Sequence, residues 1–535
     1  MKKINIIKLL LLATPLSFFA QIPAPKVVVG IVIDQMCYDY LYRFEHVYAT
    51  GGFKRLLTKG TNCRNTQYNY VPTYTAPGHA SIYSGTTPSN HGIVGNDWYV
   101  RDLRKTVTSV SDIRYTTVGS LAGGVAAPMN LLSYTITDQL KMAQNYKSKT
   151  IAIALKDRGA ILPGGHTANA AYWYDSKEGR WISSSFYFNE LPSWVQSFNS
   201  EERALKYVQK GWNTIYPIET YTQSAEDENK FEGKLPGEKS TSFPHDLKGG
   251  NPLEVIRTTP YGNSITKDFA LKALENEKLG KNGSTDFLAI SFSSTDYVGH
   301  NFGPQSIELE DTYLRLDKDI AEILTYLDAQ YGKDQVLVFL TADHAVAEVP
   351  GYAISKKLPG GVFDRNASIS DMKKAINQAF GNVDLLVGEE NSQLYFNHNL
   401  MDKMGIDAKK LFDVIRKSYQ KQAGFSELIN LKDIQGANLN AQYTQLIING
   451  YHPARSGDFM ILLKPSWFMG SKTGTTHSTL YSYDTHVPLL FYGWKVKPSE
   501  IVKRTYISDI SVTLANWLHI SEPSGSIGNV ITQIP

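Results

Sequence analysis

Residues 26–34 read KVVVGIVID, an almost unbroken run of Val and Ile that ends in the carboxylate of Asp34. Such a run is typical of a strand that is buried on both faces, as in the centre of a parallel sheet. The chain therefore predicts an α/β fold, in which helices flank a central, mostly parallel sheet. Further runs that predict strands of this sheet lie at 150–155, 286–292, 335–341 and 487–492.

A long helix is expected between the third and fourth of these strands, from about 306 to 331. Its apolar residues, from Ile307 to Leu327, recur with a period close to 3.6. Glu308 lies in its first turn and Gly332 follows its last, as helix ends favour. The order strand, helix, strand predicts a βαβ unit. We also expect a last helix at 508–518 and an edge or antiparallel strand at Phe459–Leu463.

Two segments interrupt this rhythm. Residues about 160–285 are rich in Trp, Tyr, Asn, Pro and Gly, and residues about 350–455 combine loops with one helical run near 407–420. Because α/β folds place substrate-shaping elements at the carboxyl end of the sheet, we expect both segments to be insertions that cover the active site. Residues 21–535 are then one composite domain.

The composition of the chain limits the classes of protein to which it can belong. The 535 residues are 42% hydrophobic and 20% charged, which suits a globular core rather than a disordered chain. The net charge is +3 and no dense Lys/Arg run occurs, so no nucleic acid partner is expected. We expect a monomer that acts on a small molecule.

The N-terminus carries an export signal. Lys2 and Lys3 precede an apolar stretch that ends at Ala20, a small residue suited to cleavage. Residues 1–20 therefore predict a signal peptide and a periplasmic or secreted protein; a retained membrane anchor is the alternative. Later windows do not reach the length of a membrane span, so none is expected after signal removal.

The cysteine count restricts the metal chemistry. Cys37 and Cys63 are the two cysteines of the chain, too few for a cysteine-based metal cluster. They could form one disulfide in an oxidising compartment or stay as two free thiols. A metal site in this chain must use oxygen and imidazole ligands.

Carboxylate and imidazole groups follow several predicted strands. Asp34 ends the first, Asp343 and His344 follow VLVFLTA, and Asp296 and His300 lie four residues apart in STDYVGH. Residues four apart face the same side of a helical turn, so the last pair could hold one cation. Taken singly, each feature is more often a surface pair or a helix cap, but together they predict a metal site. A mixture of nitrogen and oxygen ligands suits Zn²⁺.

A hydroxyl nucleophile is expected in the segment 71–79, VPTYTAPGH. Pro77 favours a first helical turn, which would place Thr75 at or just before the helix N-cap. Free backbone N–H groups and the positive helix end would stabilise its alkoxide there. The alternative is that Thr75 merely caps the helix. Thr73, farther from the turn, is a weaker candidate.

Three side chains are candidates for binding an anionic substrate. Lys156 and Arg158 follow the strand at 150–155 and share one face if the backbone stays extended. Arginine offers a planar fork for two oxygens, and lysine a compact positive charge. Asn96 has an amide that can donate to a further oxygen. Each residue could instead belong to an ordinary surface turn.

These motifs resemble those of the alkaline phosphatase superfamily, and most closely those of the exported phosphate-irrepressible alkaline phosphatases (PafA type). The resemblance covers nearly the whole mature chain, and its most specific parts are YVPTYTAPGHASIYSG, LKDRGAILPGGH, SSTDYVGHNFGP, FLTADHAVA and GTTHSTLYSYDTHVPLLFYGW. It implies an alkaline phosphatase-like fold and two Zn²⁺ ions. The implied ligands are Asp296, His300 and His477 for the first ion, and Asp34, Asp343 and His344 for the second, with Thr75 bridging as the nucleophile.

The resemblance also implies a reaction. Asn96, Lys156 and Arg158 match the family's phosphate-contacting residues, and His486 is expected to support the ligands from outside. The implied activity is zinc-dependent hydrolysis of small phosphate monoesters through a phosphothreonine intermediate, with an alkaline pH optimum. A third, magnesium site is not evident, and Lys156 and Arg158 are expected to do its electrostatic work.

Two alternatives remain open. A nucleotide pyrophosphatase or phosphodiesterase of the same superfamily would share the threonine and the metal ligands. An exported zinc-binding protein without turnover would explain the ligands but would give Thr75 no role. An arylsulfatase is disfavoured, because Ala-Pro-Gly follows Thr75 where that branch needs a Cys or Ser in C/S-x-P-x-R.

Overall fold

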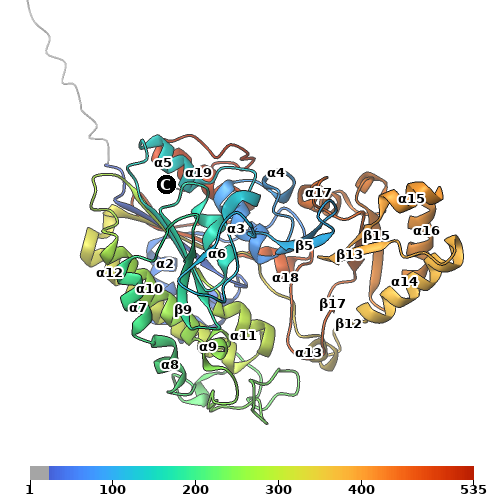
Figure 1. Cartoon of the computed structure of the whole chain (residues 1–535). Helices are drawn as coiled ribbons and strands as arrows, with labels where there is room; N and C mark the ends of the chain where they lie inside the picture. Colours follow the sequence, from blue (N-terminus) through green and yellow to red (C-terminus); the bar gives the residue numbers. More distant parts are fainter. Residues whose placement is uncertain (1–22, 535) are drawn as a thin grey trace, which may run out of the picture.

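The computed structural model describes residues 23–534, so the predicted signal peptide at 1–20 lies outside the described part. The main body is a ten-stranded mixed sheet with helices on both faces (Figure 1). Its five central strands are parallel, and the next strand on each side, beyond β11 and beyond β8, runs antiparallel to them. The predicted α/β class is confirmed. The central strands, in sheet order, are β11 (Val336–Thr341), β1 (Val27–Ile33), β10 (Asp286–Phe292), β7 (Thr150–Ala154) and β8 (Ala170–Asp175).

The register of the central strands makes them end level with one another. β1 is buried along its whole length, as its Val- and Ile-rich sequence predicts. Ile33 at its end pairs with Phe292 of β10, and Val32 pairs with Thr341 of β11. Residues that follow these strands are therefore neighbours at one edge of the sheet.

The expected strand at 487–492 is divided. Pro488 separates β18 (His486–Val487) from β19 (Leu489–Gly493). Proline lacks the N–H that a ladder hydrogen bond needs, which explains a break at this position. β19 runs antiparallel to β11, and β18 pairs with β3 (Thr66–Gln67) in a separate small sheet.

Helices cover both faces of the sheet. Figure 1 shows α10 (Tyr261–Asn276) and α12 (Ile307–Tyr331) on one side, and α3 (Thr75–Ser84), α6 (Asp157–Gly164) and α19 (Asp509–Leu518) on the other. The predicted long helix is confirmed. Ser306 caps α12 by accepting the Leu309 N–H at 3.1 Å, and Gly332 ends it with a φ of 91°.

The segment 160–285 is more integrated than an insertion would be. β8 and β9 (Arg180–Ser184) extend the main sheet, and α10 packs against β10. The aromatic side chains of β8 are buried. Part of the Trp- and Tyr-rich sequence that we expected to form loops therefore forms strands of the core.

The segment 350–455 lies largely in a second body, seen on the right of Figure 1. A four-stranded antiparallel sheet packs there against α14 (Arg365–Phe380) and α16 (Ala408–Tyr419) over its own apolar core. The strand expected at Phe459–Leu463 is β16. It is antiparallel, as one alternative held, but it lies inside this second sheet and not at an edge.

Two further expectations concern thiols and membranes. Cys37 and Cys63 are free thiols, which decides between the two alternatives left by the sequence. Within residues 23–534, we find no helix with the length and apolar character needed to cross a bilayer.

Candidate active site

Four neighbouring parallel strands deliver polar side chains to one edge of the main sheet. In sheet order, the residues just beyond β11, β1, β10 and β7 include Asp343, Asp34, Asp296 and Lys156. Since parallel strands end at a common edge, side chains far apart in the chain come together there.

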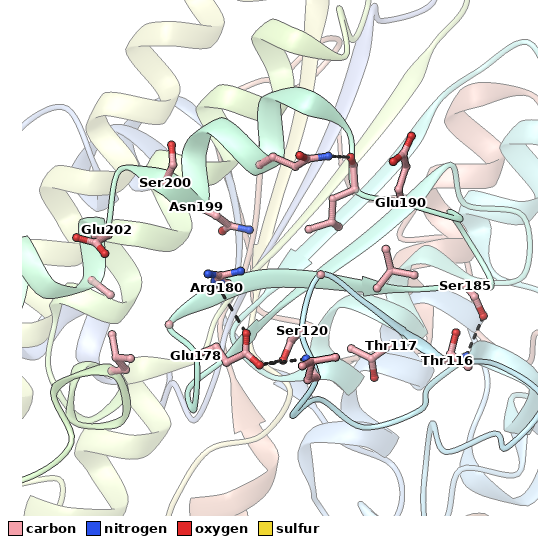
Figure 2. Close-up of a pocket in the computed structure, with 18 of the residues that line it drawn as sticks. Thr116, Thr117, Ser120, Glu178, Arg180, Ser185, Glu190, Asn199, Ser200 and Glu202 are labelled. Atoms are coloured by element: carbon pink, nitrogen blue, oxygen red, sulfur yellow. Dashed lines mark hydrogen bonds and ion pairs between the residues drawn. The ribbon is translucent and has the colours of Figure 1, made fainter.

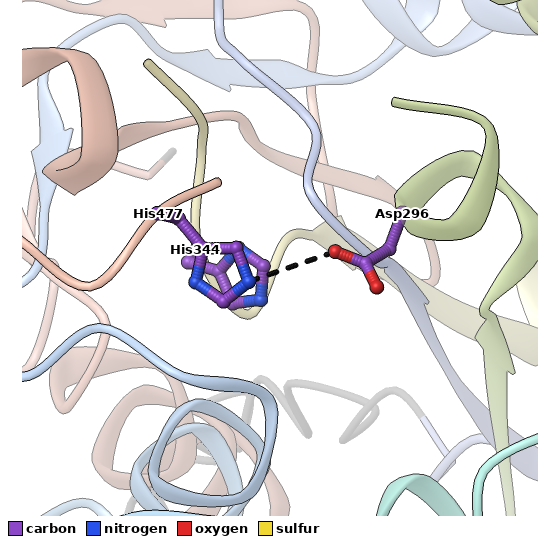
Figure 3. A group of neighbouring side chains, drawn as sticks. All are labelled: Asp296, His344 and His477. Carbon is purple, nitrogen blue, oxygen red and sulfur yellow. Dashed lines mark ion pairs between the residues drawn. The ribbon is translucent and has the colours of Figure 1, made fainter. Parts of the chain in front are cut away.

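The ligating atoms form two overlapping groups. Asp34, Asp343 and His344 offer atoms that lie within 4.8 Å of one another, as the resemblance implied for the second ion. The other group is Asp296, His344 and His477 (Figure 3). His344 therefore belongs to both groups, where the sequence-based assignment had His300 in the first. The rings of His344 and His477 are stacked with centroids 3.5 Å apart.

His300 nevertheless lies beside the first group. Both Asp296 and His300 are on α11 (Ser294–Phe302), and their i, i+4 spacing directs both side chains to one side. His300 Nε2 lies 3.1 Å from Asp296 Oδ1, and the His300 ring centroid is 5.2 Å from that of His477. Its side chain is 36% exposed, which sets it at the mouth of the site.

All three histidines present the same nitrogen to the carboxylates. The Nδ1 atoms of His300, His477 and His344 lie 2.7, 2.7 and 3.1 Å from backbone carbonyl oxygens. A carbonyl oxygen only accepts hydrogen bonds, so Nδ1 carries the proton and Nε2 has the free lone pair. This is the arrangement of a histidine held for metal ligation.

The negative charge of the site exceeds the positive charge that the chain supplies. Asp34, Asp296 and Asp343 are buried together, and Lys156 Nζ lies 2.8 Å from Asp34 and 2.6 Å from Asp296. Apart from the contact of Asp34 Oδ2 with Lys156, the Asp34 oxygens, Asp343 Oδ2 and His344 Nε2 have no hydrogen-bond partner. Buried charge without partners is costly, so divalent cations bound by nitrogen and oxygen fit this donor set.

The pKa shifts agree with a ligand set. Burial raises the pKa of Asp34 and of Asp343, as expected for carboxylates without enough positive charge around them. Burial also lowers the pKa of His344 to about 3 and lowers that of His477, so both rings are neutral. Burial acts in the same sense on His300, but the Asp296 carboxylate outweighs it and raises the His300 pKa.

Thr75 is the first residue of α3 and not its cap. Tyr74 is the N-cap residue, and its side chain makes no capping hydrogen bond. The Thr75 hydroxyl therefore lies one position inside the helix, 3.4 Å from Lys156 Nζ. The neighbouring N–H groups are not free as expected, because the Ala76 N–H donates to Asn96 Oδ1 at 2.9 Å and Pro77 has no N–H.

The other threonine is engaged elsewhere. The Thr73 hydroxyl donates to the Thr479 carbonyl at 3.2 Å, and the Thr73 carbonyl accepts the Nδ1–H of His477. Thr73 thus orients an expected ligand, which leaves Thr75 as the better placed hydroxyl.

The three substrate-binding candidates differ in how they are placed. Lys156 is the N-cap of α6 and Arg158 lies in its first turn, so the chain is not extended here as the alternation argument assumed. The Arg158 side chain is one quarter exposed, and its nearest acid, Asp157, is 3.7 Å away. Because Asn96 Oδ1 accepts the Ala76 N–H, the Asn96 amide nitrogen is the end left to donate.

Sequence reasoning missed two residues that contact the site. His79 lies 2.9 Å through Nδ1 from the Thr75 carbonyl and 3.5 Å from Asp343 Oδ2. Its position four residues after Thr75 could have predicted this contact, because residues four apart on a helix face the same side. Gln35 donates hydrogen bonds to Asp343 and Asp296, and no pattern in the sequence pointed to it.

His486 lies in a different environment from the one expected. Its Nε2 is 3.0 Å from the Arg64 carbonyl, and its ring stacks on Tyr38 with centroids 4.7 Å apart. β18 carries it into the small sheet with β3, which directs the side chain to these partners rather than to the ligands.

One large cavity lies away from the ligating groups. About 1140 Å³ in volume, it lies at the β6–β9 edge of the sheet, where β6 is Thr117–Val118 (Figure 2). Its polar groups have partners of their own: Ser120 donates to Glu178 at 2.9 Å, and Arg180 lies 4.0 Å from Glu178. Among the residues that line it are none of the expected ligands, so the ligating geometry locates the site better than cavity size.

Comparison with known proteins gives a consistent picture. The family model described as type I phosphodiesterase / nucleotide pyrophosphatase matches residues 28–488. The chain is 46% identical to "Alkaline phosphatase PhoV" of Synechococcus elongatus, over 97% of this chain and 94% of that protein. It is 45% identical to a protein of Myroides odoratus named "Calcium-transporting ATPase", over 95% of this chain and 94% of that protein. The crystal structure of wild-type alkaline phosphatase PafA superposes with a TM-score of 0.93 at 41% identity, covering 96% of this chain and 99% of that chain.

Proposed function

The chain belongs to the type I phosphodiesterase / nucleotide pyrophosphatase family within the alkaline phosphatase superfamily, and we propose that it is an alkaline phosphatase with two Zn²⁺ ions and a phosphothreonine intermediate. Like PhoV and PafA, which are named alkaline phosphatases, it is a phosphoric monoester hydrolase. The metal identity, the number of ions and the covalent intermediate are the parts that we propose.

One observation carries the proposal. Lys156 Nζ lies 3.4 Å from the Thr75 hydroxyl and also contacts Asp34 and Asp296, one carboxylate from each ligating group. The Lys156 side chain therefore contacts the Thr75 hydroxyl and one carboxylate of each ligating group. A protein that only stored zinc would have no need for a hydroxyl at this point.

The ligands fit two divalent cations. Asp34, Asp343 and His344 would hold one, and Asp296, His477 and His300 would hold the other, with His344 close to both. When bound, such ions supply positive charge that polarises phosphoryl oxygens and lowers the pKa of a hydroxyl nucleophile.

The chain's own residues account for the rest of the reaction. The Thr75 oxygen attacks phosphorus, the bond to the substrate alcohol breaks, and the alcohol leaves with a proton. Water then cleaves the phosphothreonine and releases inorganic phosphate. Asn96 Nδ2 and the Arg158 guanidinium would hold the phosphoryl oxygens, and Lys156 would stabilise the Thr75 alkoxide.

Lys156 also supports an alkaline preference. Burial lowers the pKa of Lys156, but the neighbouring carboxylates of Asp296 and Asp34 outweigh burial and raise it above its ordinary value. The ammonium therefore keeps its charge at a pH where loss of the Thr75 proton becomes easier. We propose that monoester turnover increases from neutral to mildly alkaline pH.

A phosphodiesterase is the second candidate, because the family description names that activity. We favour the monoesterase because Lys156 contacts Thr75 and Arg158 adds a second cation that interacts with Asp34 and Asp296, and two cationic groups suit a doubly charged phosphate end. Export to the periplasm or the medium, and a monomeric state, remain proposals from the sequence.

The test compares p-nitrophenyl phosphate with bis(p-nitrophenyl) phosphate before and after chelation. We expect chelation to abolish turnover, Zn²⁺ to restore it better than Mg²⁺ or Ca²⁺, and kcat/KM for the monoester to exceed that for the diester by at least about tenfold. A diester preference would support the second candidate. Zinc uptake without release of p-nitrophenol from either compound would contradict both.

A further inference from the structure

Gln35 connects the two ligating groups. It follows Asp34 directly, is buried, and has a φ of 67°, in the left-handed region that residues other than glycine seldom adopt. Its backbone N–H donates to Asp343 Oδ1 at 3.2 Å, and its side-chain Nε2 donates to Asp296 Oδ1 at 2.6 Å. The two carboxylates belong to different groups, so one residue contacts an expected ligand of each proposed cation.

Gly299 makes room for the Gln35 amide. It lies inside α11 between Asp296 and His300, where glycine destabilises a helix relative to alanine. Its backbone has no positive φ that would require glycine. A Cβ at this position would overlap Gln35 Oε1, and the three nearest atoms, out to 3.8 Å, all belong to the Gln35 side chain. Space for that amide is therefore what glycine provides.

We infer that Gln35 is a positioning residue that fixes the Asp296 carboxylate relative to Asp343, and that Gly299 is its steric counterpart. The inference rests on the proposed two-metal function. The Gln35 amide donates to Asp296 Oδ1, the oxygen that faces the Nε2 atoms of His300 and His477, and this bond limits rotation of the carboxylate. Hydrogen-bond partners of metal ligands of this kind change metal affinity by about 10–100-fold when they are removed.

Three variants test the coupling: Gln35→Ala, Gly299→Ala and the double variant. Gln35→Ala removes the donor, and Gly299→Ala pushes the amide away from Asp296. With the Gln35 side chain truncated, the added methyl meets no atom closer than 3.8 Å, so the second change has little further effect. Zinc affinity is measured on each purified full chain by competition with a fluorescent chelator, and kcat and KM are measured at limiting and saturating zinc.

We expect each single variant to bind the weaker of its two zinc ions about 10–100-fold less tightly than wild type, with much of kcat regained at saturating zinc. The double variant should resemble Gln35→Ala, which is the signature of one shared contact. Wild-type zinc affinity in either single variant would overturn the inference. So would independent, additive losses, which would indicate two unrelated structural defects.

The wild-type protein separates this inference from the proposed function. If wild type takes up no zinc in the competition assay, or gains no phosphatase activity from it, the proposed function fails. If wild type binds zinc and turns over, but Gln35→Ala matches it, only the role of Gln35 fails. Gly299→Ala replaces glycine with a better helix former, so its expected loss of affinity would not come from a weakened helix.

Discussion

At the residue scale, the chemistry depends on how few partners the Thr75 hydroxyl has. It lies inside the first turn of α3 rather than at the cap, and the side chain that contacts it is that of Lys156, with Nζ at 3.4 Å. Asn96 and Pro77 leave little free N–H at this helix end. In the proposed mechanism, stabilisation of the Thr75 alkoxide would therefore fall to Lys156 and to bound cations rather than to the helix itself.

Thr75→Ala is expected to lower monoester kcat by a factor on the order of 10⁴ or more, because it removes the proposed nucleophile. Thr75→Ser keeps a hydroxyl at the same atom and is the matched control, with measurable turnover. Zinc content, measured by elemental analysis, should stay at the wild-type value in Thr75→Ser. A Thr75→Ala protein with near-normal turnover would require another nucleophile.

Arg158 provides a test of substrate charge. Its guanidinium lies 3.7 Å from Asp157, and Asp34 and Asp296 also act on it electrostatically, which places it beside the site; we expect it to form a fork with two phosphoryl oxygens. Arg158→Ala should lower kcat/KM for p-nitrophenyl phosphate by about 10–100-fold and that for the diester much less. Arg158→Lys, which keeps the charge but not the fork, should recover part of the loss. Equal losses on the two substrates would favour the phosphodiesterase.

At the element scale, a hairpin of the second body supports the loop that carries Asn96. β13 (Leu386–Glu390) and β14 (Gln393–Phe396) are joined by Asn391 and Ser392, with φ values of 55° and 60°. Asn391 Nδ2 donates to the Asp97 carbonyl at 2.7 Å, next to Asn96. A Cβ on Gly95 would overlap the Asn391 amide.

Gly95→Ala should therefore displace either the hairpin tip or the Asn96 loop. We expect monoester kcat/KM to fall by roughly tenfold, as for loss of one hydrogen bond to a charged group, while zinc binding stays at the wild-type level. Gly124→Ala is the control, because no atom lies within 4 Å of a Cβ there and its φ is not in the left-handed region. Equal activity of the two variants would show that the tip does not position Asn96.

The order of strands and helices explains which site residues could be predicted from the sequence. Asp34, Asp296 and Asp343 were predictable together because each follows a buried run, and parallel strands end at one edge. Lys156 was identified and is itself extended, but α6 begins right after it, so the assumption that the backbone stays extended as far as Arg158 was wrong. The position of His344 in both ligating groups depends on packing against His477, which no local spacing encodes.

Other features depend on long-range contacts. Gln35 acts through partners more than 250 positions away, and its left-handed backbone has no glycine to announce it. The strands β8 and β9 were hidden because their buried aromatic residues resemble the composition of a loop region. Pro488, in contrast, was visible in the sequence and could have predicted the break between β18 and β19.

At the scale of the whole molecule, stability also depends on carboxyl groups buried far from the site. Asp319 lies on α12, where the Ser264 hydroxyl donates to it at 3.0 Å and Lys267 Nζ is 3.7 Å away. Burial raises the Asp319 pKa to about 7, and Lys267 offsets only part of this effect. In an unfolded chain, an aspartate titrates near pH 4.

This difference fixes the sign of a pH effect. Between about pH 4 and pH 7, the folded protein holds a proton on Asp319 that the unfolded chain has released, so folding takes up a proton. The contribution of Asp319 to stability therefore decreases as pH rises through this window. Asn cannot ionise, so the Tm of Asp319→Asn relative to wild type should increase from pH 4 to pH 7, by about 3 °C for a chain of this size. Scanning calorimetry of both proteins with saturating zinc at each pH measures this difference in Tm. A difference in Tm that stays constant or decreases toward pH 7 would show that Asp319 is ionised in the folded state.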